Sequence, residues 1–138
     1  MRTPCKADKY GAFINLLFYQ GPSGKFFGNV EIDHAKIAGG DVVPYSPLIS
    51  AEMSYSMLAM EGIRCGVKVK YASQTYADIE NKIELPAFIN LSISAEKNIF
   101  ENFSLYAEAS NLLNRKNYCY HGYYEKTLDV TAGIIYVW

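Results

Sequence analysis

The chain has 138 residues, a length that fits one domain, and its formal net charge of −1 favours neither nucleic acid nor an acidic substrate as a partner. Half of the residues are hydrophobic and 20% are charged, which argues against a disordered chain. Aromatic residues make up 14% of the chain, mainly 12 Tyr and 7 Phe, and this share is typical of β-sheet with one wet face.

The N-terminal residues 1–10 lack the basic start and apolar stretch of a signal peptide, so we expect any exported form to have a longer precursor. No apolar run approaches the roughly 20 residues that a membrane-spanning helix requires. Cys5, Cys65 and Cys119 lack metal-site spacing and leave one thiol unpaired. We therefore expect three unrelated thiols, with a bridge between Cys5 and Cys119 as the alternative.

Alternation of apolar and polar residues with a period of two predicts about seven strands. Residues 11–19 are apolar on both faces apart from Asn15, and residues 26–37 alternate less regularly than the later segments. Five later segments alternate strictly, so each is predicted to be a strand with one apolar and one polar face. Their apolar faces are Ile49, Ala51, Met53, Tyr55 and Met57; Ile63, Cys65, Val67, Val69 and Tyr71; Leu85, Ala87, Ile89, Leu91, Ile93 and Ala95; Phe103, Leu105, Ala107 and Ala109; and Leu128, Val130, Ala132, Ile134, Tyr136 and Trp138.

The connections between these strands alternate between short and long. The short ones carry Gly, Pro, Ser or Asn, which turns require, and span residues 20–25, 59–62 and 98–102. The long ones span residues 38–47, 72–84 and 111–126. Short turns on one rim and long loops on the other are typical of a transmembrane barrel, with the short turns periplasmic and the long loops extracellular.

Three features favour lipid rather than a protein core against the apolar face. Most strands have about ten residues, enough to cross a bilayer at a tilt. The polar face is rich in Ser and Thr, and its charges are expected to pair Glu52, Glu96 and Glu108 with Arg64, Lys68 and Lys70. Aromatic residues collect near the strand ends, as in interfacial girdles: Phe26, Phe27, Phe100, Phe103, Tyr136 and Trp138 on one side, and Tyr45, Tyr71, Tyr76 and Tyr118 on the other.

The predicted fold class is therefore all-β, an antiparallel up-and-down transmembrane β-barrel segment. Ile89, Leu91 and Ile93 are expected to point away from the barrel axis. A sheet in lipid must close, because its edge N–H and C=O groups find no water there. About seven strands do not form the even-numbered closed cylinder that is usual in bacteria, so we expect an incomplete barrel.

Several motifs resemble the C-terminal part of TonB-dependent outer-membrane receptors. The last eight residues, 131–138, resemble the terminal signal that the barrel-assembly machinery recognises, through Gly133, Ile134, Tyr136 and Trp138, although Phe is the usual last residue. Three further segments resemble parts of the family. The start of one of its strands is similar to Leu85-Pro86-Ala87-Phe88, and two of its loops are similar to residues 109–118 and to Val43-Pro44-Tyr45-Ser46-Pro47. The resemblance covers roughly residues 25–138.

The resemblance implies that residues 1–138 are the C-terminal portion of a barrel domain in the outer membrane of a Gram-negative cell, with the C-terminus in the periplasm. It implies uptake of a scarce nutrient such as a siderophore, cobalamin, a glycan or a peptide, without a cofactor. The implied partners are outer-membrane lipid, the barrel-assembly machinery and a small nutrient ligand. The plug domain and TonB box of the family have no counterpart here, so TonB would be reached only through other regions.

The loop 117–124 holds the densest group of side chains with binding chemistry. Amphipathic aromatic residues often contact ligands, so the ligand-contact candidates are Tyr118, Tyr120, His121, Tyr123 and Tyr124. The alternative is that these residues form an aromatic girdle and pack the loop. His121 has only Glu125 nearby, which is too few ligands for a metal site.

No catalytic motif is present, so the chain is not expected to be an enzyme. A carboxylate pair among Glu52, Glu96 and Glu108 is the catalytic alternative, and ion pairing with the basic residues is expected instead. Two further functional alternatives are a complete small outer-membrane barrel for adhesion or anchoring, if residues 1–10 contain another strand, and a soluble ligand-binding β-barrel with its apolar face inward.

Overall fold

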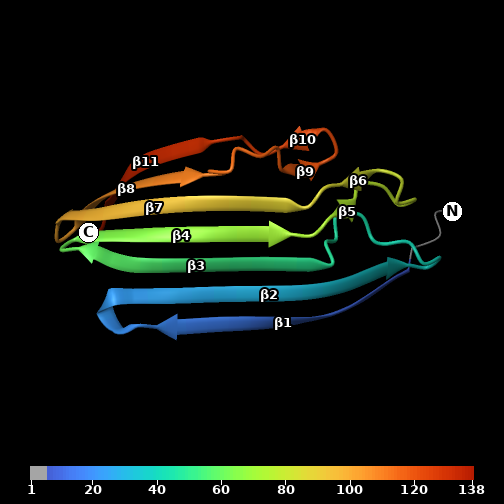
Figure 1. Ribbon diagram of the computed structural model, residues 1–138, viewed down its shortest axis with the longest axis horizontal. Coiled ribbons are helices and arrows are strands. Elements are labelled where there is room, and N and C mark those ends of the chain that lie inside the picture. Colours follow the sequence, from blue (N-terminus) through green and yellow to red (C-terminus); the bar gives the residue numbers. More distant parts are fainter. Residues whose placement is uncertain (1–5) are drawn as a thin grey trace.

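Seven long strands form one antiparallel sheet in the computed structural model, which describes residues 6–138 (Figure 1). The strands follow one another up and down in chain order, so the predicted all-β, up-and-down fold is confirmed. They are β1 (Ala7–Tyr19), β2 (Gly24–Ile37), β3 (Ile49–Met60), β4 (Ile63–Ala72), β7 (Phe88–Phe100), β8 (Phe103–Ser110) and β11 (Asp129–Tyr136). The sheet is open, with β1 and β11 as its edges.

The predicted asymmetry of the connections is also present. On one side, β1 and β2 are joined by the 3-10 turn η1 (Gly21–Ser23), and the other two turns consist of residues 61–62 and 101–102. On the other side lie the loops 38–48, 73–87 and 111–128 (Figure 1). Two of these loops contain small hairpins, formed by β5 (Thr75–Tyr76) with β6 (Glu84–Leu85) and by β9 (Tyr118–Tyr120) with β10 (Tyr123–Tyr124).

The strand predicted to start at Leu85 starts instead at Phe88. Pro86 interrupts the ladder because it has no backbone N–H to donate. Leu85 pairs with Thr75 in the β5–β6 hairpin and is only 4% exposed, so its predicted place on the lipid face is wrong. The last strand is also shorter than predicted, since it ends at Tyr136 rather than at Trp138.

The first strand extends further toward the N-terminus than residues 11–19. Ala7 to Tyr10 continue β1 and pair with the end of β2, where Ala7 lies opposite Ile37. These residues therefore belong to the first strand and do not form a separate one. Cys5, and with it the alternative bridge to Cys119, lies outside the described residues.

From β2 to β11 the register mainly aligns apolar with apolar and polar with polar residues, whereas the edge strand β1 is apolar on both faces and places Phe13 opposite Glu31. Val67 lies opposite Tyr55 on one side and Ile93 on the other, whereas Lys68 lies between Ser54 and Ser92. Because side chains alternate along each strand, one face of the sheet is apolar and the other is polar. We call them the apolar face and the polar face.

The apolar face covers no protein core. Among the described residues only two apolar side chains are buried, Ala35 and Leu85. Ile93 in the middle of β7 is 50% exposed, and Ile134 of β11 is 63% exposed. In water, full burial of a large apolar side chain is worth about 1.5–3 kcal/mol, and these side chains forgo roughly half of that gain, whereas contact with lipid would restore it. The arrangement argues against a soluble barrel with its apolar face inward.

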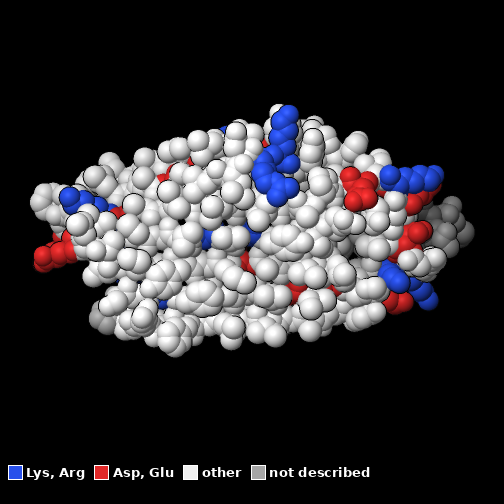
Figure 2. All heavy atoms as spheres, in the orientation of Figure 1, with Lys and Arg blue, Asp and Glu red and all other residues white. Residues whose placement is uncertain are grey.

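In the view of Figure 2, charged side chains gather at the two ends of the molecule, a basic group stands out near the middle of its upper edge, and small charged patches show at its centre. Within residues 6–138, no helix has the length and apolar character needed to cross a membrane.

The face assignment predicts unequal losses of stability for substitutions at two neighbouring positions. Ile93→Lys places a charge on the apolar face and should cost about 2–4 kcal/mol of unfolding free energy in a bilayer. Ser94→Lys places the same charge on the polar face, opposite Glu108 in the register, and should cost less than about 1 kcal/mol. Urea unfolding of the complete gene product in lipid vesicles measures both, and equal losses would contradict the assignment.

Candidate functional site

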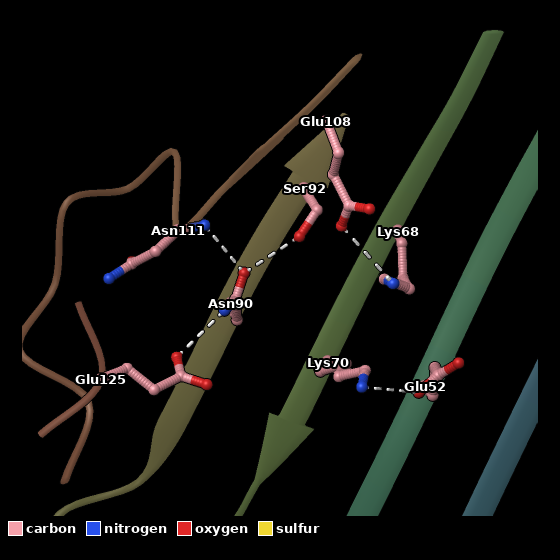
Figure 3. Close-up of polar contacts among 8 residues, drawn as sticks. All are labelled: Glu52, Lys68, Lys70, Asn90, Ser92, Glu108, Asn111 and Glu125. Carbon is pink, nitrogen blue, oxygen red and sulfur yellow. Dashed lines mark hydrogen bonds and ion pairs between the residues drawn. The ribbon is translucent and has the colours of Figure 1, made fainter. Parts of the chain in front are cut away.

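The middle of the polar face carries ion pairs between strands (Figure 3). Lys70 Nζ lies 3.5 Å from Glu52 Oε2, and Lys68 Nζ lies 3.8 Å from Glu108 Oε1. Two of the predicted ion pairs are therefore formed, and they hold Glu52 and Glu108 to different lysines. The pairs are part-exposed, so they add little stability, but they line the polar face with alternating charge.

The β8–β11 loop is bound to β7 through Asn90 (Figure 3). Asn90 Nδ2 donates to Glu125 Oε2 at 3.0 Å. Asn90 Oδ1 accepts from the backbone N–H of Asn111 at 3.0 Å and from Ser92 Oγ at 3.2 Å. One amide side chain on the polar face thus connects both ends of this loop to the sheet.

The side chain of Asn111 is buried inside the β8–β11 loop and is hydrogen-bonded to the backbone of that loop. Asn111 is 1% exposed and has a φ of 52°, a left-handed conformation that Asn adopts more readily than most residues. Its Nδ2 donates to the carbonyls of Arg115, at 2.7 Å, and Lys126, at 3.0 Å. These bonds satisfy carbonyls that no strand neighbour reaches.

Asn117 takes the place of a strand partner where β8 has already left β7. It is 2% exposed, its Nδ2 donates to Ile89 O at 2.8 Å, and its Oδ1 accepts from Ile89 N at 3.3 Å. The backbone N–H of Glu125 donates to Asn117 O at 2.8 Å. The loop is therefore hydrogen-bonded along β7, which positions the β9–β10 hairpin.

The other two long loops are joined to each other. Asn81 Oδ1 accepts from Val42 N at 2.7 Å, and Asn81 Nδ2 donates to Val42 O at 2.9 Å. The backbone N–H of Tyr45 donates to Tyr76 O at 2.8 Å. The N–H of Ile83 donates to the Asp78 carboxylate and holds the pKa of that group below its usual 3.8.

The five ligand-contact candidates fall into two sets. Tyr118 and Tyr124 form an edge-to-face pair with ring centroids 6.0 Å apart, and Tyr120 packs on Tyr45 of the neighbouring loop at 5.3 Å. His121 and Tyr123 are exposed at the tip of the hairpin, Tyr123 by 75%. No group of three metal-ligating side chains occurs within residues 6–138.

The cysteines in the described residues form no disulfide. Cys65 lies on the apolar face of β4, opposite Met57 and Ala95. Cys119 lies on the β9–β10 hairpin, and partial burial raises the pKa of its thiol.

The residues of the predicted assembly signal lie on and just after the edge strand β11. Ile134 and Tyr136 lie opposite Leu105 and Phe103 on the apolar face. Gly133 lies under the ring of Tyr106 on the polar face, where a Cβ atom would come within 2.5 Å of that ring. Trp138 is 99% exposed.

Comparisons with known proteins point to one fold. No family model matches the chain, and no curated protein matches it. Among solved structures, the siderophore receptor PiuA of Acinetobacter baumannii aligns over 95% of this chain with a TM-score of 0.80 and 16% identity. The ferric yersiniabactin uptake receptor FyuA of Yersinia pestis aligns over 94% with a TM-score of 0.76 and 18% identity. The FpvAI–pyocin S2 complex aligns over 96% with a TM-score of 0.78 and 12% identity.

The chain has the fold of a barrel wall in outer-membrane transport receptors. More particularly, its predicted resemblance to the barrel of TonB-dependent receptors is confirmed as a likeness of fold. The chain spans only 19% to 22% of the length of these three structures.

The side chain of Asn111 is predicted to hold the β8–β11 loop in shape. Asn111→Ala removes the bonds to Arg115 O and Lys126 O, of which Arg115 O keeps the N–H of Asn117 at 3.1 Å, and should loosen the loop by about 1–3 kcal/mol through the loss at Lys126 O. Asn114→Ala is the matched control, because Asn114 has a similar φ of 51° but an exposed side chain. Hydrogen exchange of residues 112–126 should rise strongly only in Asn111→Ala; equal exchange in both variants would assign the effect to backbone strain.

Proposed function

We propose that this chain forms part of the barrel wall of an outer-membrane receptor that takes up a scarce nutrient, with an iron chelate as the leading ligand class. The observation that carries the proposal is the match of nearly the whole chain to siderophore receptors, with TM-scores of 0.76 to 0.80. The exposed apolar face supports a place in outer-membrane lipid, and the ion-paired polar face supports a hydrated lumen. The role is that of a receptor and transporter rather than an enzyme.

The proposed orientation of the chain in the membrane follows from the lengths of the connections between its strands. Short turns lie on the periplasmic rim of such barrels and long loops on the extracellular rim. The loops 38–48, 73–87 and 111–128 then face the medium, and the C-terminus lies in the periplasm. Coupling to TonB would take place through regions outside this chain.

The extracellular ligand contacts are proposed to come from Tyr118, Tyr120, His121, Tyr123 and Tyr124. The rings are held on a hairpin that is hydrogen-bonded to β7 through Asn117, so they are positioned before a ligand arrives. Such preorganisation lowers the entropic cost of binding.

Uptake by whole cells tests the proposed function. Deleting the gene should abolish accumulation of at least one labelled ferric chelate, and a gene copy should restore it only while the inner membrane is energised. Replacing Tyr118, Tyr120 and Tyr124 together by Ala should raise the half-saturating concentration by about tenfold or more, given about 0.5–1.5 kcal/mol for each aromatic contact. Glu61→Ala, in a short turn, is the control. Unchanged accumulation of every iron chelate, cobalamin, glycan and peptide offered would refute the proposal.

The terminal residues Gly133, Ile134, Tyr136 and Trp138 are proposed to form the signal for the barrel-assembly machinery. Trp138 is almost fully exposed, so its removal should leave the packing of the sheet unchanged. Trp138→Ala should sharply reduce folded receptor in the outer membrane, and Trp138→Phe should preserve it. Val137→Ala, the neighbouring exposed position, is the matched control. Heat-modifiable gel mobility reports the folded fraction, and equal amounts in all three variants would exclude the signal.

A further inference from the structure

A cavity of about 280 Å³, open to solvent on one side, lies among the three long loops. Two of its residues, Ala72 and Phe88, end β4 and begin β7 opposite each other in the register. They lie two residues beyond Lys70 and Asn90, so by alternation they share the polar face. The cavity therefore adjoins the extracellular end of the proposed lumen. Its lining comes from all three loops and includes Tyr45, Thr75, Phe88, Tyr118 and Cys119.

The chemistry of this cavity differs from that of the rest of the sheet. None of its lining residues carries a formal charge, and Tyr45, Phe88 and Tyr118 contribute aromatic rings. Four other cavities along the sheet each include charged residues, such as Arg64 or Glu125. A charged group would lose hydration in the uncharged cavity without gaining a partner, whereas a neutral ring would gain aromatic contacts.

The walls of the cavity are held from several directions. Tyr45 is bound to the β5–β6 hairpin through the backbone bond from its N–H to Tyr76 O. Tyr118 follows Asn117, whose side chain is bonded to both backbone groups of Ile89. Pro47 and Pro86 restrict the backbone at two further points. The cavity is thus preformed rather than created by a ligand.

The size of the cavity sets the size of its occupant. A protein cavity of about 150 Å³ accommodates benzene, and pockets for whole small-molecule ligands measure about 300–1,000 Å³. The volume here suits one or two fused rings and not an entire chelate. Thr75 Oγ1, in the wall, is buried and has no hydrogen-bond partner among the described residues. One polar atom on the ring could satisfy it after rotation of the Thr75 side chain.

We propose that this cavity is a binding subsite for one uncharged aromatic group of a larger ligand, whose polar remainder lies over the charged part of the polar face. The assignment of that group to a transported nutrient rests on the proposed function. Binding of the free ring does not depend on transport, so the aromatic subsite and the proposed transport function can be tested separately.

Cys119 provides a direct measure of occupancy because it lines the cavity. The complete gene product is placed in phospholipid vesicles with every cysteine except Cys119 replaced, including Cys5→Ser and Cys65→Ala. Modification of Cys119 by a charged methanethiosulfonate reagent is timed in mildly alkaline buffer, since burial raises the pKa of this thiol. The probes are naphthol and naphthoate, which share a ring system and differ in charge.

Naphthol should slow the modification in a saturable manner, and naphthoate should not do so at equal concentration. Phe88→Ala should raise the half-protecting concentration of naphthol by about threefold to tenfold, the loss expected for one aromatic contact. Ala72→Phe fills the cavity and should abolish protection, which keeps the test valid if Phe88→Ala does not fold. Leu113→Ala is the matched control, because Leu113 is exposed on the same loop as Cys119, lies outside the cavity and is not among the proposed ligand contacts.

Any one of three results would overturn the subsite. These are equal protection by naphthoate, absence of protection by naphthol, and protection by naphthol that persists in both cavity variants. Chelate uptake by the same variants separates this result from the proposed function. Uptake without naphthol protection removes the subsite and leaves the receptor proposal standing. Naphthol protection without uptake of any nutrient supports the cavity as an aromatic site and removes the transport role.

Discussion

Backbone pairing is the constraint on which the rest of this structure depends, because in the proposed membrane setting lipid offers no partner to an N–H or C=O group. The antiparallel ladder from β1 to β11 supplies those partners between neighbouring strands and determines which residues lie opposite one another. With the register determined, alternation places Val67 and Ile93 on one face and Lys68 and Ser92 on the other. The apolar face, the polar face and the ion pairs between strands therefore share one cause.

The same requirement continues into the long loops, where the ladder ends but backbone groups remain to be satisfied. There, amide side chains replace strand neighbours: Asn117 bonds both backbone groups of Ile89, and Asn81 bonds both backbone groups of Val42. Asn suits this role because its side chain carries a donor and an acceptor in the arrangement of a peptide group. Loops held in this way can keep aromatic side chains in fixed positions.

Much of the sheet could be predicted from sequence, since residues such as Ile63 to Tyr71 alternate without exception and each contributes to the same pattern. The start of β7 could not, because Leu85 fits the alternation and only Pro86 signals the break. The cavity among the three long loops could not be predicted from the sequence. Its aromatic residues Tyr45, Phe88 and Tyr118 come from segments far apart in the chain, and only the pairing of the loops brings them together. Asn111 and Asn117 belong to the segment 109–118 that resembles a loop of the family, but their burial could not be predicted from that pattern because it depends on the folding of the loop.

The number of strands has a consequence for how such a sheet can close. Six antiparallel pairings separate β1 from β11, so the two edge strands run in the same direction. A ring built by joining copies edge to edge would therefore contain a parallel seam at every junction, or copies inserted upside down with their long loops on both sides of the membrane. An antiparallel cylinder that includes this sheet instead needs an odd number of further strands, which makes the total even, as is usual for bacterial barrels.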